Sequence, residues 1–473
     1  RSMGAAQVDY LVPNRFEYGY GLSPEIVEVA AAQNPDLLIT VDNGISSIEG
    51  VKAAKSKGIK VVVTDHHLPA DELPNADALI NPNQHGCEFP SKNLCGVGVI
   101  FYVMSALRRT LQERGWFQQQ QIPVPNMASF LDLVALGTVA DVVTLDQNNR
   151  VLVDQGLKRI RAGVARPGIL ALLEVAGRKP ATLVASDLGF AVGPRLNAAG
   201  RLEDMSIGIE CLLADTVDQA RALAFQLDEL NQDRKSIEQS MQEQALKILD
   251  DMELGGDGSL PAGLCLFDDS WHEGVIGILA SRIKERLNRP VIAFAAAEGG
   301  MIKGSARSIP QLHIRDALDA VAARHPELLS KFGGHSMAAG MSLKQEHFDA
   351  FSQAFDEEAR RQLSEEDFQA RVESDGELSS QDINLETAQL LREAGPWGQN
   401  FPEPMFDGVF DLVQQRIVGQ RHLKLVLAEP GSGFCVDAIA FNVDLDIWPS
   451  QSSQARVAYK LDINEFRGRT SVQ

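Results

Sequence analysis

The stretch VVVTDHHLP, residues 61–69, joins a run of β-branched residues directly to a carboxylate and two imidazoles. Three valines and a threonine in succession predict a buried strand of a parallel sheet. Asp65, His66 and His67 would then lie at the carboxyl end of that strand, the edge of the sheet where α/β proteins bind ligands. The stretch therefore predicts an α/β domain with a polar site at one edge of its sheet.

The flanking sequence supplies the rest of such a sheet. DLLITV (36–41) and ADALINP (76–82) are further strand candidates, and SIEGVKAAKSKG (47–58) has the pattern of an amphipathic helix. This alternation of strands and a helix indicates βαβ units. Asp42 directly follows the first of these strands, so we expect its carboxylate at the same edge of the sheet as Asp65.

A third acid is expected at this edge. Asp141, in LGTVADVV (136–143), follows a helix predicted over 127–139. Carboxylates mixed with imidazoles suit Mn²⁺ or Mg²⁺, and such ions activate water and stabilise a phosphoryl group during its transfer. The alternative is that Asp42 caps a helix and that the histidines are ordinary loop residues, but their combination after a buried strand favours the metal site.

The composition sets wider limits. A chain of 473 residues with 44% hydrophobic and 23% charged residues is expected to form about two to four domains. It contains no run of 18 apolar residues, so we expect no transmembrane helix and no membrane partner. The five cysteines are odd in number and form no CxxC pair, which indicates the reducing cytoplasm. The net charge of −20 argues mildly against non-specific duplex binding, although bound cations can reverse a local field.

The pattern of elements divides the chain into four parts. Apolar residues from Phe225 to Ile248 recur at helical spacing, which predicts a long helix that connects two domains. After about residue 370, short alternating runs separated by turns predict a small antiparallel barrel. The expected parts are a first α/β domain (1–205), a connecting helix (206–255), a second α/β domain (256–365) and the barrel (371–473).

Three glycine-rich motifs are candidates for holding phosphate groups. In KFGGHSMAAG (331–340), two glycines precede a predicted helix of small residues, whose free backbone N–H groups suit a phosphate. The alternative is that the two glycines only form a tight connection. KGSARS (303–308) places a serine and an arginine among small residues that allow close approach. GPRLNAAGR (193–201) offers charge-assisted bonds to phosphate, or it is a surface turn with ordinary ion pairs. The candidate substrate-binding residues in these motifs are Gly333, Gly334, His335, Ser305, Arg307, Arg195, Asn197 and Arg201.

Several motifs also resemble a known family. VTDHHLP, TVDNGIS and LGTVADVV are similar to motifs of the DHH phosphoesterase superfamily. The longer motifs YLVPNRFEYGYGLS, GPRLNAAGRL, WHEGVIGILASR and KFGGHSMAAGMSL resemble the RecJ family of single-stranded-DNA-specific exonucleases. The resemblance extends over essentially the whole chain, and several of its motifs are eight or more residues long.

This resemblance implies a 5′→3′ exonuclease that degrades single-stranded DNA to mononucleotides by two-metal-ion phosphodiester hydrolysis, in DNA recombination and repair. It implies that Asp42, Asp65, His66 and Asp141 ligate or orient two Mn²⁺ or Mg²⁺ ions in the intact protein. His67 would meet the scissile phosphate or support a ligand, so that Asp65, His66 and His67 form the catalytic group.

The resemblance further implies a DHH catalytic domain at 1–205, a DHH-associated domain at 256–365 that grips the DNA backbone, and an OB-like barrel at 371–473. Arg15 would bind a 5′-terminal phosphate. Tyr20 would stack on or wedge against a base, or it is a core aromatic beside a glycine turn. Single-stranded DNA with a 5′ end is the expected partner, and single-stranded-DNA-binding protein is a second partner implied by the family alone.

One family feature is missing, the Asp-x-Asp-x-Asp-Gly turn of the family's first motif. Both ends of the chain read as cuts, so we expect a fragment that binds metal poorly and does not cut DNA by itself. Two other functions remain open: a small-substrate DHH phosphodiesterase or nanoRNase, and a non-catalytic scaffold that binds single-stranded DNA. The barrel at 371–473 favours a polymer substrate, and the intact acids and histidines favour an enzyme.

Overall fold

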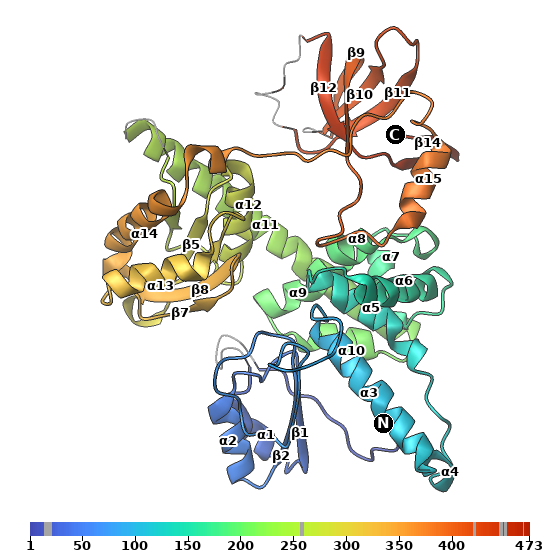
Figure 1. Ribbon diagram of the computed structural model, residues 1–473, viewed down its shortest axis with the longest axis vertical. Helices are drawn as coiled ribbons and strands as arrows, with labels where there is room; N and C mark the ends of the chain where they lie inside the picture. Colours follow the sequence, from blue (N-terminus) through green and yellow to red (C-terminus); the bar gives the residue numbers. More distant parts are fainter. Residues whose placement is uncertain (14–20, 256–259, 420–421, 444–447, 449–451, 467) are drawn as a thin grey trace. The chain divides into compact units, whose positions relative to one another are not determined.

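The computed structural model describes residues 1–13, 21–255, 260–419, 422–443, 448, 452–466 and 468–473 (Figure 1). These residues form two compact units. The first unit contains Arg1–Leu196, Met205–Phe225 and Val372–Gln473, and the second contains Asn197–Asp204 and Gln226–Arg371. The β-rich C-terminal region therefore belongs to the same compact unit as the N-terminal sheet.

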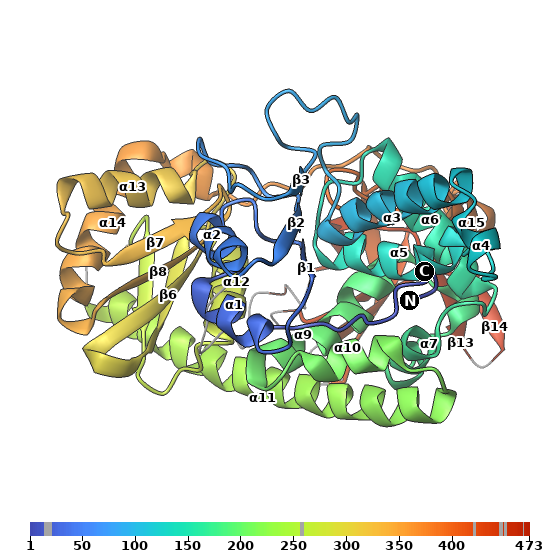
Figure 2. The same ribbon diagram turned by 90° about the horizontal axis from the view of Figure 1, so that it is seen from below.

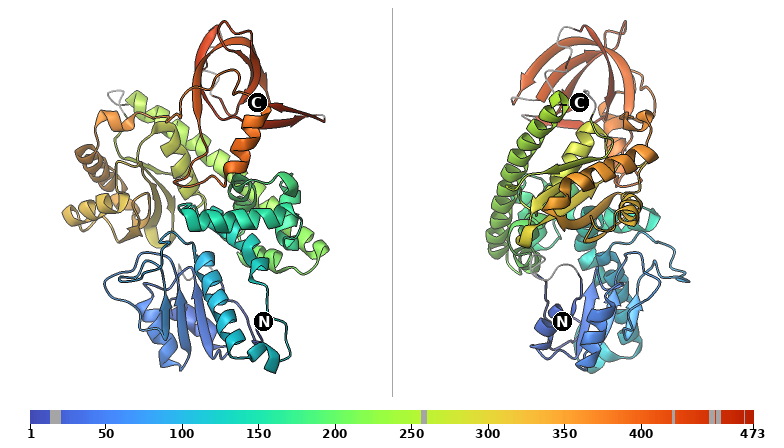
Figure 3. Two further views of the ribbon diagram at one scale, coloured as in Figure 1. Left: turned by 45° about the vertical axis from the view of Figure 1, so that its right-hand side comes forward. Right: turned by 90° about the vertical axis from the view of Figure 1, so that its left-hand side faces the viewer.

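A parallel sheet with the strand order β1-β2-β3 opens the first unit, as the sequence predicts. Val41 of β1 pairs with Thr64 of β2, so the two strands end together. Val27, Val51 and Val61 are fully buried between the sheet and its helices. Figure 3 shows α1 and α2 on one face of the sheet and α3 on the other. The elements are α1 (Pro24–Ala31), β1 (Leu37–Val41), α2 (Ile48–Ser56), β2 (Lys60–Thr64) and β3 (Ala78–Ile80).

A group of packed helices follows the sheet in the first unit. Helices α5 and α6 approach so closely that a Cβ atom on Gly156 of α6 would lie 2.2 Å from the carbonyl oxygen of Leu131. Val134 and Ala135 of α5 are also buried, so the core holds this helix in place. The elements of this group are α3 (Gly96–Glu113), α4 (Trp116–Gln119), the 3₁₀ helix η1 (Met127–Phe130), α5 (Leu131–Ala140), α6 (Gln147–Arg161), α7 (Pro167–Val175), the 3₁₀ helix η2 (Pro180–Thr182), α8 (Ala185–Asp187) and the π-helix η3 (Leu188–Val192).

The connecting region differs from the single helix expected over 206–255. After α9 (Gly193–Leu202) it forms α10 (Ser206–Leu213) and α11 (Val217–Gly255), which starts in the first unit and continues into the second. The backbone is extended at Ala214, where α10 ends. Thr216 caps the next helix, because its Oγ1 accepts a hydrogen bond from the N–H of Gln219 (3.3 Å). The apolar spacing is helical on both sides of this break, and for that reason it did not reveal the break.

The second unit is built on a mixed five-stranded sheet with the order β4-β5-β6-β8-β7. Separate cores cover its two faces: Phe294 and Phe351 belong to the core beside α13 and α14, and Leu279 and Ala293 to the core beside α11 and α12. Figure 2 shows α13 and α14 on one side of these strands and α12 on the other. The elements are β4 (Leu264–Phe267), α12 (Ile276–Leu287), β5 (Val291–Ala296), η4 (Glu298–Gly300), β6 (Met301–Arg307), α13 (Ile314–Arg324), β7 (Lys331–Gly334), β8 (Ala338–Lys344), η5 (Gln345–His347), α14 (Phe348–Gln362) and η6 (Glu365–Phe368).

The helix predicted after the two glycines of 331–340 is wrong. Residues 331–344 form a β-hairpin, in which β7 and β8 are antiparallel and the N–H of His335 donates to the carbonyl oxygen of Ala338 (2.8 Å). No helix N-terminus therefore lies at this motif, and a phosphate site there needs another explanation.

The C-terminal region contains the antiparallel strands that the sequence predicts. Four of them form a sheet with the order β11-β10-β9-β12, and alternate residues Leu423, Leu425 and Leu427 of β10 are buried in its core. The elements are α15 (Leu385–Ala394), β9 (Phe406–Val418), β10 (His422–Ala428), β11 (Cys435–Ala440), β12 (Gln454–Tyr459), β13 (Ile463–Phe466) and β14 (Arg469–Val472). Within the described part of the chain, every helix is too short or too polar to cross a membrane.

Candidate functional site

Asp42 and Asp65 lie side by side at the carboxyl edge of the N-terminal sheet. Each is the first residue after its strand, and the strand ladder continues through both of them. The N–H of Asp42 donates to Thr64 (3.1 Å), and the N–H of Asp65 donates to Ile80 (3.0 Å). The strand pattern of the sequence thus predicted the position of both acids correctly.

A tight turn directs Asp42 away from its strand. Its backbone is left-handed (φ 67°), a conformation that aspartate tolerates better than most residues. The Oγ1 atom of Thr40 donates to the carbonyl oxygen of Asn43 (2.7 Å) and closes the turn. On the other side, a Cβ atom on Gly96, the first residue of α3, would lie 2.7 Å from Oδ1 of Asp42. The carboxylate is therefore held between this turn and the start of α3.

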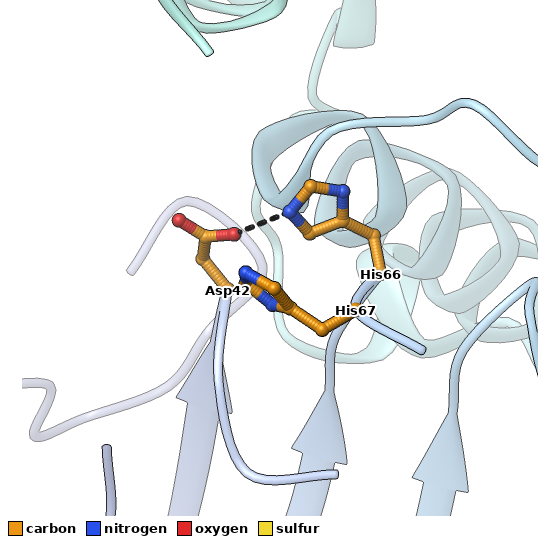
Figure 4. A group of neighbouring side chains, drawn as sticks. All are labelled: Asp42, His66 and His67. Carbon is orange, nitrogen blue, oxygen red and sulfur yellow. Dashed lines mark ion pairs between the residues drawn. The ribbon is translucent and has the colours of Figure 1, made fainter. Parts of the chain in front are cut away.

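The imidazole of His66 brings two acids from distant segments together. Its Nε2 atom lies 2.9 Å from Oδ1 of Asp42 and 3.5 Å from Oδ2 of Asp141. Asp141 is the C-cap of α5. The side chain of His67 joins the same group, because one ligand atom from each of Asp42, His66 and His67 lies within 4.8 Å of the others (Figure 4). Three segments that are far apart in the sequence therefore converge at one point.

Asp65 has a different environment from the other acids. It is 1% exposed, and backbone N–H groups and a ring nitrogen surround its carboxylate. Oδ2 accepts from the N–H of Ile45 (2.9 Å), and Oδ1 accepts from the N–H of His66 (2.7 Å) and of His67 (3.2 Å). Oδ1 also lies 2.7 Å from Nδ1 of His67. Asp65 thus holds the backbone of residues 65–67 in place and orients the ring of His67.

The ionisation of these groups follows from the same contacts. Burial opposes the charged form of Asp65, but the hydrogen bonds from His67 and from the backbone N–H groups outweigh it and lower the pKa of this carboxyl group. The hydrogen bond to Asp65 raises the pKa of His67. Burial would lower the pKa of His66, but the carboxylates of Asp42 and Asp141 beside it raise this pKa above its ordinary value.

The group fits a divalent cation. Carboxylate oxygens and imidazole nitrogens are the ligands that Mn²⁺ accepts readily, and Mg²⁺ takes the oxygens. Within the described residues, Nε2 of His66 is buried without a hydrogen bond of good geometry, although two carboxylate oxygens lie within 3.5 Å of it. A cation between the nitrogen and these oxygens would satisfy all three atoms.

In the second unit, Ser305 and Arg307 lie on one face of β6. Nη1 of Arg307 donates to Oγ of Ser305 (3.1 Å) and to the carbonyl oxygen of Ala306 (2.8 Å). Both side chains close over the start of α12, where a Cβ atom on Gly277 would lie 2.9 Å from each of them. The structure therefore brings these two predicted residues together.

Gly333 belongs to the same face as Ser305. Ser305 pairs with Gly340 of β8, and Gly340 pairs with Gly333 of β7, so the three form one row across three strands. Among the described residues, no heavy atom lies within 4 Å of a Cβ placed on either glycine of this row. Gly334 is different, because its Cβ would lie 2.4 Å from the carbonyl oxygen of Ala338. Gly333 thus lies on an open surface, whereas Gly334 serves the hairpin.

The third predicted motif forms helix α9. Nη1 of Arg195 donates to the carbonyl oxygen of Ala191 (2.6 Å) within the first unit. Asn197 is exposed and, like Arg201, belongs to the second unit, where Nη1 of Arg201 donates to the carbonyl oxygen of Gly274 (3.1 Å). Arg15, expected at a 5′-terminal phosphate, and Tyr20, expected to stack on or wedge against a base, lie outside the described residues.

Comparisons with known proteins identify the family. Three family models match: the DHH family N-terminal domain over residues 1–138, the DHHA1 domain over 261–361 and the RecJ OB domain over 374–473. A single-stranded-DNA-specific exonuclease RecJ of Dickeya dadantii is 60% identical to this chain over its whole length, and the match covers 82% of that relative. The chain belongs to the RecJ family. The RecJ of Escherichia coli K12 is 59% identical with the same coverage of both chains.

A solved RecJ structure has the same fold. The crystal structure of RecJ from Thermus thermophilus in complex with Mn²⁺ matches 95% of this chain with a TM-score of 0.76 and 29% sequence identity, and the match covers 62% of that chain. These matches confirm the fold class predicted for this chain, which has a parallel-sheet DHH domain, a DHH-associated domain and an OB domain.

Three further residues of this candidate site were not predicted from the sequence. Nδ2 of Asn81 donates to the carbonyl oxygen of His67 (2.8 Å), and Nδ2 of Asn83 donates to that of His66 (2.6 Å). Both asparagines follow β3, so the rule that placed Asp42 and Asp65 at the sheet edge applies to them as well. Gly96 was missed because its contact with Asp42 joins segments with no common pattern in the sequence.

Proposed function

We propose that this chain carries the catalytic body of a 5′→3′ exonuclease that hydrolyses single-stranded DNA to mononucleotides, with Mn²⁺ or Mg²⁺ as the cofactor. The observation that supports this most directly is the meeting of Asp42 and Asp141 at Nε2 of His66. The three residues come from the ends of β1, α5 and β2. A mostly buried imidazole at a strand end, between two acids, suits a cation, and the RecJ relatives are named as nucleases.

The proposed ligands of the ion are Asp42, His66 and Asp141. When bound, a divalent ion supplies an activated water at neutral pH and neutralises charge on the phosphoryl oxygens. Asp65, which the sequence analysis grouped with the ligands, uses both carboxylate oxygens in hydrogen bonds to the protein. We therefore assign it the orientation of His66 and His67. A second ion requires oxygen ligands beyond these residues.

His67 is proposed to contact the scissile phosphate. Its Nδ1 atom lies 2.7 Å from Oδ1 of Asp65, and Nε2 is the second nitrogen of the ring. The raised pKa of His67 favours the protonated ring, which can donate from Nε2 to a phosphoryl oxygen. The contact with Asp65 also fixes the orientation of the ring toward the site before substrate arrives.

The sheet of the second unit offers a surface for the DNA backbone. Helix α12 packs on β5 and β6, whereas Gly333 and Gly340 are open. On the same face, Lys303 pairs with Ser342 and Ser342 pairs with the exposed Lys331. Glycines give close backbone approach, and the positive charge of Lys331 would neutralise phosphate charge. Nζ of Lys303 lies 2.9 Å from Oε2 of Glu273, so its charge is shared with that acid. We propose that this surface, with Arg307 and His335 at its end, grips the strand.

Other parts of the proposal rest on sequence motifs and on the family. Arg15 would bind the 5′-terminal phosphate, Tyr20 would stack on a base, and Arg195, Asn197 and Arg201 would contact the backbone. The OB domain would bind the strand further along, where Arg416 and Lys424 form a cross-strand pair on β9 and β10. The same proposal gives the domain bounds as 1–205, 206–255, 256–365 and 371–473. It also includes a link to single-stranded-DNA-binding protein, a cytoplasmic location and a role in DNA recombination and repair.

Substrate choice tests this function. Protein from the complete reading frame is given Mn²⁺ and either a 5′-phosphorylated single strand, the same strand in a duplex, or a dinucleotide. We expect mononucleotides from the single strand, slow reaction of the duplex and poor use of the dinucleotide. Preference for the dinucleotide would indicate a small-substrate phosphodiesterase, and tight DNA binding without hydrolysis would indicate a scaffold. Assay of the 473-residue chain beside it tests the proposal that this chain is inactive alone.

A further inference from the structure

Phe190 is the most exposed of the large hydrophobic side chains that the structure describes, with 86% of its surface accessible. It lies in the middle of the π-helix η3, between the fully buried Leu188 and the buried Ala191 and Val192. Burial of a phenylalanine side chain contributes about 1.5–3 kcal/mol to stability. The ring of Phe190 therefore contributes little to the stability of the fold, although most of the residues around it in η3 are buried.

The segment around Phe190 is held in place on both sides. A Cβ atom on Gly189 would lie 3.2 Å from Cγ1 of Val139, and one on Gly193 would lie 3.4 Å from Cβ of Ala140. The π-helix is therefore packed directly on the last turn of α5. π-turns inside helices are rare and occur often at functional sites. The exposed ring is carried by a fixed segment and not by a loose loop.

This packing places η3 beside the proposed metal site. Val139 and Ala140 are the last two residues of α5, and Asp141 follows them as its C-cap. Two more exposed apolar side chains directly follow site residues: Leu68 (67% exposed) follows His67, and Val142 (64%) follows Asp141. Val142 also has a left-handed backbone (φ 58°), which is unfavourable for a β-branched residue.

Proposed metal ligands with exposed apolar side chains around them suit a substrate that has both a charged group and an apolar surface. A nucleotide of a single strand has a charged phosphate and an aromatic base whose faces can stack on a protein side chain. We propose that Phe190 stacks on a base of the single-stranded DNA near the metal site. This inference rests on the proposed function and adds a binding residue to it. Stacking of this kind tolerates every base, as a nuclease that degrades strands of any sequence requires.

The test uses protein from the complete reading frame and steady-state hydrolysis of a 5′-phosphorylated single strand with Mn²⁺. The variants are Phe190→Ala, Phe190→Leu and Phe190→Trp. The matched control is Phe225→Ala, because Phe225 is also exposed (58%) but lies on α11. We expect kcat/KM to fall about 5- to 150-fold for Phe190→Ala, the range that the loss of one stacked base gives. Phe190→Leu should fall similarly, whereas Phe190→Trp and Phe225→Ala should stay near the wild type.

Strands with one abasic position supply the second readout, since a merely structural role would not depend on the substrate. At the stacked position, loss of the base should lower the wild-type rate to that of Phe190→Ala, and the variant should lose nothing more. Wild-type activity of Phe190→Ala or Phe190→Leu would overturn the inference, as would an equal loss on every abasic strand. If the wild type itself leaves single strands intact, the proposed function fails as well; if only the Phe190 effects are absent, it stands.

Discussion

Nδ1 of His67 lies 2.7 Å from Oδ1 of Asp65, and this contact separates the roles of the two acids at the sheet edge. Asp65 is buried, and both of its oxygens accept hydrogen bonds from the protein. Asp42, at the end of the neighbouring strand, is about half exposed and turns one oxygen toward His66. One acid thus builds the site, and the other is available to a ligand.

Substitution by asparagine should lower the stability of the fold at Asp65 but the affinity for metal at Asp42. Asp65→Asn removes a charged acceptor from several N–H groups, so the free energy of unfolding should fall by about 1.5–3 kcal/mol. Asp42→Asn should change it by less than about 0.5 kcal/mol and, in protein from the complete reading frame, should abolish tight Mn²⁺ binding. Urea unfolding of the metal-free proteins and calorimetric titration with Mn²⁺ measure both effects. Equal destabilisation by the two changes would contradict the division of roles.

Gly96 should be essential to the site for steric reasons. A Cβ atom there would lie 2.5 Å from Cβ of Asp42. Gly96→Ala should therefore displace the carboxylate and weaken Mn²⁺ binding at least tenfold. Gly98→Ala, in the same helix, is the control, because the nearest atom to its Cβ would be Cδ2 of Leu94 at 3.0 Å, the end of a side chain. Metal titration of both variants decides; unchanged Mn²⁺ affinity in Gly96→Ala would show that Asp42 is not held as described.

Metal binding should weaken as the pH falls. A cation and a proton compete for Nε2 of His66, and the carboxylates of Asp42 and Asp141 overcome burial to raise the pKa of this ring. Below that raised pKa the ring is protonated, so Mn²⁺ affinity should decrease up to tenfold per pH unit. In the metal-free protein, Asp141→Asn removes a negative charge and should lower the pKa of His66 in an NMR titration. An unchanged pKa would mean that Asp141 does not act on His66 in solution.

The neighbouring glycines of β7 should respond differently to a side chain. Gly333→Val adds its side chain to open space, so the fold should be retained while single-stranded DNA binds more weakly. Gly334→Val would place Cβ 2.5 Å from Cα of Ala339, so the hairpin should be destabilised. Thermal unfolding and DNA titration separate the two outcomes. Unimpaired DNA binding by a folded Gly333→Val protein would remove this face from the proposed path of the strand.

Exposed lysine on this face should contribute to the salt dependence of binding. If Lys331 contacts a phosphate, Lys331→Gln should reduce the slope of log K against log salt by about 0.7, the value for one phosphate contact on a single strand. Lys247→Gln, at an exposed position of α11, should leave the slope unchanged. The slopes come from titrations at several salt concentrations, and an unaltered slope for Lys331→Gln would exclude that contact.

The sheet edge could be predicted because its signals are local. The strands β1 and β2 are apolar runs, and an acid directly follows each of them, so Asp42 and Asp65 were placed correctly. Which acid faces a ligand could not be predicted in this way. That difference depends on the N–H of Ile45 and on the packing of Gly96, contacts between segments that no sequence pattern links.

The hairpin at 331–344 shows the other limit. Small residues with good helix propensity suggested a helix, but Ala339, Met341 and Leu343 are buried and the residues between them are not. This two-residue period was present in the sequence and indicates a strand. Burial against α13 and α14 decided the structure, and intrinsic propensity did not.

The most direct test of the central claim is the position of Mn²⁺ in crystals of the protein from the complete reading frame, located by its anomalous scattering. We predict an ion coordinated by the carboxylates of Asp42 and Asp141 and by Nε2 of His66. An ion bound elsewhere, with the carboxylate of Asp141 directed away from His66, would contradict the account.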